Sequence, residues 1–326
     1  MGLTRKGIIV LTIVGGLSLL SHSIGAAPIE ETTNPLGWIL STDASMYRIV
    51  VDGNGYVLNA YYGSPGRYLD LRDVAAGRTA LYRRGMREVP FRGGWVEGTP
   101  AVEVIFADHT RDADLVYDSH EILDMDGHQC LRIDLKDKYY GLRVSSYLRV
   151  FPEEDVIEKW LVLENTGDNT ILIENAQSGS VWLPVDEYDL FHFSGMWGRE
   201  FLLQKTQLTP GVKTIQTRSF VMHENPPWFA VGVSGKTNED TGGVWFGSLA
   251  WSGNWRFDFE KTFHGNVQAV GGINFWDTSW TLDPGENFET PKAVYGFSPD
   301  GLNGASNCLH DYIRDNVLRA SFREKL

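Results

Sequence analysis

The stretch LRIDLKDKYYGLRVSSYLRV, residues 131–150, decides the fold. Its apolar side chains recur at every second position, first at 131, 133 and 135 and then at 142, 144, 148 and 150. This period of two is typical of strands that bury one face. A further strand is expected at Val156–Glu164, and the connections of about five residues are too short for a parallel crossover. The segment therefore predicts an antiparallel β-meander.

Short strands of the same kind continue along the chain. Turn-forming sequences such as Asp52–Gly55 and Asp283–Gly285 separate them, and no repeat or Pro/Ser-rich linker interrupts the pattern. Many short strands without intervening helices predict an all-β fold, a sandwich of large antiparallel sheets in one domain. The further expected strands are Ile171–Asn175, Val181–Leu183, Thr214–Val221, Trp228–Val233, Val244–Trp251, Val267–Gly272 and Thr278–Leu282.

A helix is expected near the end of the chain, from about residue 299 to 318. Ser298 is suited to the N-cap and Pro299 to the first helical position. Apolar residues then recur at helical spacing, which predicts one buried face. They are Leu302, Ala305, Cys308, Leu309, Tyr312, Ile313 and Val317.

The charge and composition exclude several classes of function. The chain has 326 residues and a formal charge of −13, and no Lys/Arg cluster forms the basic stripe that nucleic-acid binding requires. Nucleic acid is therefore not expected as a partner, whereas a neutral sugar is compatible with this charge. The sequence has no glycine-rich phosphate loop and no His or Cys pair at metal-ligand spacing. We expect neither a metal nor a cofactor.

Residues 1–26 have the plan of a secretory signal peptide. Arg5 and Lys6 precede an apolar run from Gly7 to Leu20, and small residues follow up to Ala27. An uncleaved membrane anchor is the alternative, but a spanning helix needs about 20 apolar residues. Cleavage after Ala26 predicts a secreted or periplasmic chain, residues 27–326, that has no contact with the membrane.

The chain has two cysteines, Cys130 and Cys308. Cys130 stands at the head of an expected strand and Cys308 on the apolar face of the expected helix. Export permits a disulfide between them, but two buried free thiols are the simpler interpretation.

Carboxylate pairs and tryptophans are the candidates for chemistry. Two close pairs, Asp112 with Asp114 and Asp124 with Asp126, stand beside turn-like or charged sequence, so we interpret them as solvated turns rather than as glycosidase acids. Tryptophans crowd the region from 197 to 280, and an indole either stacks on a sugar or fills a core. Polar neighbours favour a ligand role in two segments. The candidate substrate-binding residues there are Trp197, Arg199, Trp251, Asn254 and Trp255.

These same segments resemble the N-terminal β-supersandwich domain of family 36 α-galactosidases. A looser likeness begins near Trp38 and includes YYG at 61–63 and VYDSHE at 116–121. The closer stretches keep the family's order: SGMWGRE (194–200), NP (225–226), EDTGGV (239–244), FGSL (246–249), SGN (252–254), GIN (272–274), LDPGE (282–286), TP (290–291), GLNG (301–304), Ser306 and His310.

The resemblance implies a β-supersandwich packed against a (β/α)₈ barrel, which carries an Asp nucleophile in a Lys-Trp-Asp motif and an Asp acid/base. The nearest string here, EKWL at 158–161, lacks that Asp, and a barrel of about 250 residues does not fit after Leu326. We therefore expect no catalytic residue in this chain. Two departures stand out: GWVE at 94–97 replaces a frequent Gly-Asp-Phe-Arg turn, and Lys292 replaces the usual Glu.

Three functions remain open at this point. The first is the non-catalytic N-terminal domain of a secreted α-galactosidase that acts on terminal α-galactosides in carbohydrate catabolism. Its expected partners are an α-galactoside or oligosaccharide and either a (β/α)₈ barrel or a second copy of the chain. The second function is a stand-alone carbohydrate-binding or scaffold protein. The third is a sugar epimerase, which the scattered histidines do not favour.

Overall fold

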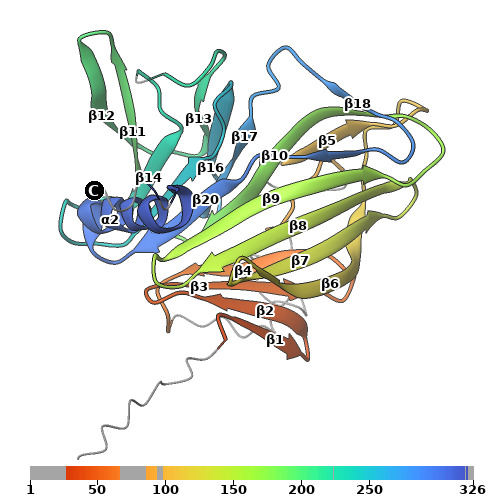
Figure 1. The fold of residues 1–326 in the computed structure, drawn as a ribbon, viewed down its shortest axis with the longest axis horizontal. Helices are drawn as coiled ribbons and strands as arrows, with labels where there is room; N and C mark the ends of the chain where they lie inside the picture. Colours follow the sequence, from red (N-terminus) through yellow and green to blue (C-terminus); the bar gives the residue numbers. More distant parts are fainter. Residues whose placement is uncertain (1–26, 67–85, 94–97, 223, 320, 322–326) are drawn as a thin grey trace, which may run out of the picture.

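The computed structural model describes residues 27–66, 86–93, 98–222, 224–319 and 321. Their strands form three antiparallel sheets, of which the largest crosses the whole of Figure 1. This ten-stranded sheet has the order β12-β11-β14-β15-β20-β9-β8-β7-β6, with β19 paired to β9. Its strands are β6 (Leu115–Met125), β7 (His128–Asp137), β8 (Leu142–Phe151), β9 (Val156–Asn165), β11 (Tyr188–Met196), β12 (Arg199–Gln207), β14 (Trp228–Val233), β15 (Val244–Leu249), β19 (Asn287–Glu289) and β20 (Ala293–Ser298).

The other two sheets are smaller. A six-stranded sheet has the order β13-β16-β17-β10-β18, and β5 also pairs with β10. Its strands are β5 (Val102–Ile105), β10 (Ile171–Leu183), β13 (Gly211–Thr217), β16 (Trp255–Lys261), β17 (Val267–Ile273) and β18 (Trp280–Leu282). The four-stranded sheet, at the bottom of Figure 1, runs β1 (Ile29–Thr33), β2 (Leu36–Ser41), β3 (Met46–Val51) and β4 (Val57–Gly63).

The predicted alternation places one face of the meander in the main core. Leu131, Ile133 and Leu135 of β7 are buried, and the core also contains Trp38 of the four-stranded sheet and Phe257 of the six-stranded sheet. All three sheets therefore share one apolar interior. Burial of such a side chain contributes about 1.5–3 kcal/mol, so the interior holds the sheets together.

A second apolar cluster covers the opposite face of the large sheet. Trp245 of β15 faces the main core, while its neighbours Val244 and Phe246 pack with Ala305 and Tyr312 of the C-terminal helix. Because both faces of β15 are buried, its sequence is apolar almost throughout. The predicted apolar face of the helix is confirmed at Leu302, Ala305, Cys308, Leu309 and Tyr312, whereas the burial expected for Ile313 and Val317 was wrong.

The helix α2 (Gly301–Tyr312) begins later than predicted and ends earlier. Asp300, not Ser298, occupies the N-cap position, and Pro299 lies outside the helix. Gly301 has a φ of +67°, a left-handed conformation that prevents the helix from continuing back through Pro299. At the other end the chain widens into a π-helical segment, η1 (Ile313–Val317), in which Ile313 and Val317 are exposed.

Most of the expected strands are present with shifted ends, and one expectation was wrong. The segments 171–175 and 181–183 belong to a single strand, β10, rather than to two. Its register shifts at Ile173/Asn175 and at Gln177/Gly179, so bulges absorb the polar residues that resembled a turn. The strand β16 was not predicted, although Trp255, Phe257 and Phe259 alternate along it.

The expected signal peptide, residues 1–26, lies outside the described part of the chain. Within the described part, no helix is long and apolar enough to cross a membrane.

Candidate functional site

The hairpin of β11 and β12 extends beyond the rest of its sheet. The neighbouring strand β14 pairs with residues 188–192 of β11, and in the described part of the chain no strand pairs with the hairpin tip on that side. On its other side β12 is the edge strand of the ten-stranded sheet. Five large apolar side chains of this hairpin are exposed, and we call them the β12 edge surface: Met196, Trp197, Phe201, Leu202 and Leu203.

Close packing at the base of the hairpin holds the β12 edge surface in place. The ring of Phe193 lies 4.9 Å from that of Trp228 and 6.1 Å from that of Phe201, measured between centroids. A Cβ at Gly195 would stand 2.4 Å from the carbonyl oxygen of Arg199, so only glycine allows the two strands this approach. Ordered apolar side chains on an edge strand are typical of a surface that contacts another protein.

The predicted substrate-binding residues occupy two segments and the core. Trp197, which is 86% exposed, and Arg199 lie at the tip of the hairpin, while Trp251 and Asn254 lie in the loop between β15 and β16. The side-chain amide of Asn254 donates a hydrogen bond to the carbonyl of Asn274 at 2.7 Å, which fixes this loop. Trp255 is only 1% exposed and packs in the main core. Its position gives Trp255 a packing role and removes it from the exposed candidates.

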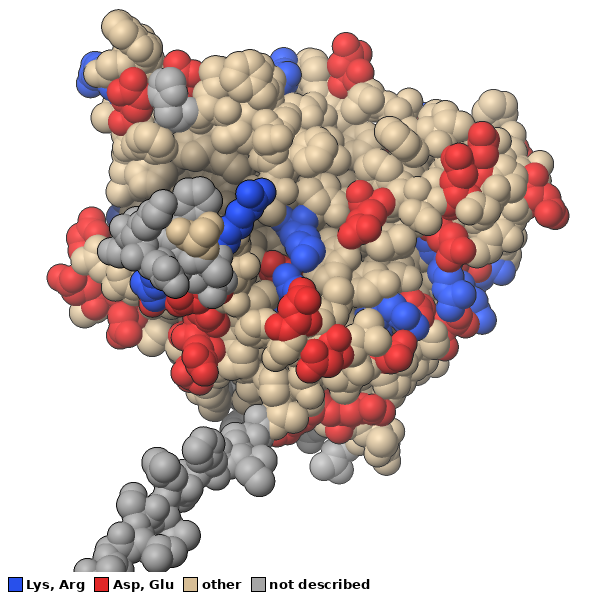
Figure 2. All heavy atoms as spheres, viewed as in Figure 1, with Lys and Arg blue, Asp and Glu red and all other residues tan. Residues whose placement is uncertain are grey.

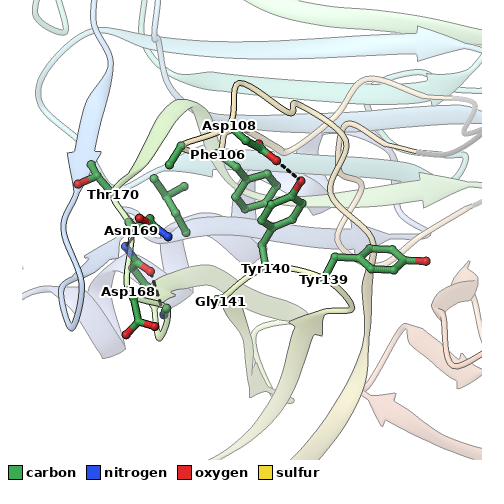
Figure 3. Close-up of a pocket in the computed structure, with 12 residues that line it drawn as sticks. Phe106, Asp108, Tyr139, Tyr140, Gly141, Asp168, Asn169 and Thr170 are labelled. Carbon is green, nitrogen blue, oxygen red and sulfur yellow. Dashed lines mark hydrogen bonds between the residues drawn. The ribbon is translucent and has the colours of Figure 1, made fainter.

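A pocket of about 460 Å³ lies at the end of the meander where two strand connections meet. Figure 3 shows Asp168, Asn169 and Thr170 on one side and Phe106, Asp108 and Tyr140 on the other, while Tyr139 points away. The first group belongs to the connection between β9 and β10, and Tyr139 and Tyr140 belong to that between β7 and β8.

The floor of this pocket depends on glycine. Gly141 and Gly167 touch, and a Cβ at Gly141 would stand 2.3 Å from the backbone nitrogen of Gly167. The buried side chain of Asn165 adds three hydrogen bonds, donating to the carbonyls of Asn169 and Leu282 and accepting from Gly167 N–H at 3.1 Å. The two connections are therefore locked together.

The pocket wall combines a ring stack with a carboxylate. Phe106 and Tyr140 stack with centroids 3.8 Å apart, and the Tyr140 hydroxyl donates to Asp108 at 2.8 Å. The backbone N–H of Thr110, and then the hydroxyl of Tyr140, lower the pKa of Asp108, which is therefore an anion at neutral pH. With Asp168 opposite, the pocket is rich in acceptors, which suits a ligand that carries hydroxyl groups. Sequence reasoning missed this pocket, although two adjacent tyrosines in a strand connection were a signal.

The string 158–161 lies in β9, and its lysine is part of the interior. Lys159 is buried, donates to the Tyr47 hydroxyl at 2.9 Å and forms an ion pair with the buried carboxylate of Glu88. Burial lowers the pKa of Lys159, and the nearby Glu88 carboxylate opposes this shift. This cluster is sealed from solvent and is structural.

The aspartate pairs do not form a facing carboxylate site. Asp124, near the end of β6, accepts from Gly127 N–H at 3.0 Å, and the exposed Asp126 lies in the tight turn between β6 and β7. Asp114 accepts from the Tyr56 hydroxyl at 2.9 Å and pairs with Lys138 at 2.8 Å. Among the described residues no cluster of three or more His, Cys, Asp or Glu side chains could hold a metal ion. The segment 94–97 lies outside the described residues.

Comparison with known proteins identifies relatives that match most of the chain. Residues 55–283 match the family model described as "Glycosyl hydrolase family 36 N-terminal domain". Alpha-galactosidase 2 of Hypocrea jecorina is 27% identical over 97% of this chain and 44% of its own length. Alpha-galactosidase AgaA of Geobacillus stearothermophilus is 29% identical over 83% of this chain and 41% of its own length.

Solved structures of α-galactosidases are also similar to this chain over less than half of their own length. The α-galactosidase AgaB of Geobacillus stearothermophilus superimposes with a TM-score of 0.83 at 26% identity, covering 91% of this chain and 44% of that one. The galactosidase domain of the α-galactosidase–sucrose kinase AgaSK also gives a TM-score of 0.83, at 25% identity. The chain thus spans less than half the length of the relatives that it matches.

Proposed function

Because this chain belongs to glycosyl hydrolase family 36, whose N-terminal domain it matches, we propose that it serves as the non-catalytic N-terminal domain of a secreted α-galactosidase. The enzyme would act on terminal α-galactosides in carbohydrate catabolism, with catalysis in a (β/α)₈ barrel outside this chain. The family match over residues 55–283 carries this proposal. The matched relatives named as α-galactosidases extend well beyond the region that this chain covers. This supports a catalytic domain that lies outside the matched region.

Two exposed apolar features support a barrel as the partner. The β12 edge surface belongs to a strand that pairs with β11 on one side and, among the described residues, with no strand on the other, and the end of the helix adds Ile313 and Val317. Figure 2 shows a band without Lys, Arg, Asp or Glu across the middle of the upper half of this view, while charged side chains of both signs lie at its margins and over the lower half. Exposed apolar side chains that stand close together, such as those of the β12 edge surface, are typical of a protein contact site. Self-association through β12 is the outcome that we expect where no barrel is present.

We also propose that exposed side chains of this chain contact the galactoside. Trp197, Arg199, Trp251 and Asn254 stand on exposed segments where an indole and polar side chains can meet a galactoside. We also propose that the chain is exported, because residues 1–26 have the pattern of a secretory signal peptide. N-terminal sequencing of the exported protein tests this, because an intact Met1 in a membrane fraction contradicts cleavage near Ala27.

A chimeric enzyme tests whether this chain can serve as the non-catalytic N-terminal domain beside a catalytic barrel. In α-galactosidase AgaA of Geobacillus stearothermophilus, this chain replaces the N-terminal region that it matches. We expect the chimera to hydrolyse a chromogenic α-galactoside and the isolated chain to show no turnover. In the chimera, Leu203→Lys on the β12 edge surface should lower the soluble yield and activity, while Tyr139→Lys, also at an exposed position, should not.

Two results contradict the proposal. One is a folded chimera that has no activity. The other is turnover by the isolated chain that disappears when Asp112, Asp114, Asp124 or Asp126 is replaced by Asn.

A stand-alone carbohydrate-binding protein is the second candidate. The acceptor-rich pocket of Figure 3, with its stacked Phe106 and Tyr140, favours it. The sequence immediately downstream in the gene separates the two functions. An in-frame barrel supports the enzyme domain, and a stop codon followed by an unrelated gene supports the binding protein.

A further inference from the structure

A second hollow, of about 250 Å³, lies on the six-stranded sheet, over β5, β10 and β16. Figure 1 shows these strands at the top, away from the C-terminal helix. Arg256 and Asp258 alternate with Phe257 and Phe259, which are fully buried in the main core. The hollow is therefore on the face of the sheet that points away from the core.

The register of the sheet creates the hollow. Gly272 of β17 pairs with Arg256 on one side and with Gln177 on the other. A Cβ at Gly272 would stand 2.8 Å from the backbone nitrogen of Ser178 and 3.1 Å from Oε1 of Gln177. Glycine thus leaves a depression between two long polar side chains.

The charges around the hollow are balanced. Arg92 contacts both Glu103 and Glu174, which lines the hollow and also pairs with Arg111. Arg256 donates to Asp258 through Nε at 2.7 Å. Because each carboxylate has a guanidinium partner, the site has no net charge with which to select a cation or an anion. Arginine and carboxylate groups side by side suit the hydroxyls of a neutral ligand, which both donate and accept.

An ordered tryptophan forms the rim. Trp276 lines the hollow together with Phe275 and is 60% exposed. The guanidinium of Arg218 lies 3.2 Å from the centre of the Trp276 ring and is not part of the lining. One face of the indole is therefore covered, which orients the ring before any ligand arrives. Aromatic rings beside planar polar side chains are suited to the C–H faces and hydroxyls of sugars.

The floor of the hollow contains a buried amide oxygen, Oε1 of Gln177, that accepts no hydrogen bond from the described residues. Gln177 is 4% exposed, and its amide nitrogen donates to Oδ1 of Asn175 and to the carbonyl of Ile273. These bonds fix the amide orientation, and no donor to Oε1 of Gln177 exists among the residues that the structure describes. Burial also raises the pKa of the lining carboxyl of Glu103, although Arg92 opposes the shift. Such groups gain from a partner that brings hydroxyl groups.

We propose that this hollow binds one sugar unit of a neutral oligosaccharide, with Trp276 against the C–H face of the ring and with Glu103, Glu174 and Arg256 contacting its hydroxyls. The site is non-catalytic and consists only of residues of this chain. Sugar binding at this site does not require a barrel. The absence of sugar binding would therefore contradict this site without contradicting the proposed role as an enzyme domain.

Saturation-transfer NMR and calorimetric titration of the full chain with melibiose and D-galactose test the site. We expect binding that Trp276→Ala weakens by at least about fivefold in Kd, since loss of an aromatic contact has an effect of this order. Phe263→Ala is the matched control, because Phe263 is an exposed aromatic residue in the connection between β16 and β17 and does not line the hollow; its Kd should equal that of the unmodified chain. Glu174→Gln, which keeps the side-chain shape, should also weaken binding.

Any of three results overturns the proposal. Binding that Trp197→Ala abolishes and Trp276→Ala leaves unchanged would place the sugar on the hairpin. No saturation transfer from either sugar would remove the site altogether. Binding of Ca²⁺ or inorganic phosphate that Glu103→Gln or Arg256→Met abolishes would show an ion site instead.

Discussion

The hydroxyl of Tyr312, on α2, donates a hydrogen bond to the carboxylate of Glu158, on β9. Glu158 also accepts from Arg149 at 2.6 Å and lies 3.5 Å from the ammonium group of Lys292. Burial, and then the charge of Glu158, raise the pKa of Tyr312 well above its usual range, so the phenol stays a donor. The last turn of α2 is therefore tied to the centre of the large sheet. The π-helical segment that contains Ile313 and Val317 follows directly on this anchored turn.

Replacing Tyr312 by Phe should destabilise this anchor. The variant removes one hydrogen bond to a charged acceptor that Arg149 still pairs, so we expect a loss of about 1–2 kcal/mol in the free energy of unfolding. Urea unfolding followed by fluorescence measures it. Tyr139→Phe serves as the control, because Tyr139 is 78% exposed and should change stability by less than about 0.5 kcal/mol. Equal losses in the two variants would show that the bond to Glu158 contributes nothing.

The buried ion pair of Lys159 and Glu88 should depend strongly on both partners. Lys159→Met leaves the Glu88 carboxylate buried without a cation, which costs about 3–5 kcal/mol. Adding Glu88→Leu removes the unpaired charge, so the double variant should recover a large part of the loss. A double variant less stable than Lys159→Met would contradict this interpretation. Chemical unfolding of the three proteins provides the comparison.

Gly141→Ala should separate the two strand connections that form the floor of the pocket in Figure 3. The new Cβ meets the backbone of Gly167 at 2.3 Å, and the overlap should cost about 1–3 kcal/mol or more. Gly53→Ala is the matched control, since a Cβ there meets nothing within 4 Å. Thermal unfolding measured side by side should show a lower Tm for Gly141→Ala alone.

The two cysteines should behave as slow, unpaired thiols. Both are free in the structure, and burial raises the pKa of Cys130 and of Cys308 to about 12. At pH 8 roughly one molecule in ten thousand carries the reactive thiolate at each site. A thiol reagent should therefore react at least about a hundredfold more slowly with the folded chain than with the urea-unfolded chain, and its rate should rise with pH. Fewer than two thiols per unfolded chain would instead indicate a disulfide.

Local patterns were sufficient to predict the meander and the packing face of the helix. The alternation at 131–150 determines which side chains of β7 and β8 are buried, because the period of a strand is two. The spacing of Ala305 and Tyr312 likewise places both against the sheet. Each of these features depends on residues that are neighbours in the sequence.

Features that join distant segments were not predictable in this way. The floor of the pocket in Figure 3 depends on Gly141 meeting Gly167, and the second hollow depends on Gly272 lying between Arg256 and Gln177. The sequence does not specify these pairings locally. Trp255 is a different case, because its alternation with Phe257 and Phe259 indicated a buried strand, whereas its polar neighbours suggested a ligand contact.

Binding of the chain to a family 36 barrel is the most direct test of its role as an N-terminal domain. Light scattering coupled to size-exclusion chromatography measures it, with the chain mixed with a separately expressed barrel of α-galactosidase AgaA. We predict that the chain alone self-associates and that the barrel converts it into a one-to-one complex, which Leu203→Lys on the β12 edge surface weakens. A monodisperse monomer that ignores the barrel and binds galactose would contradict the role and would favour a stand-alone carbohydrate-binding protein.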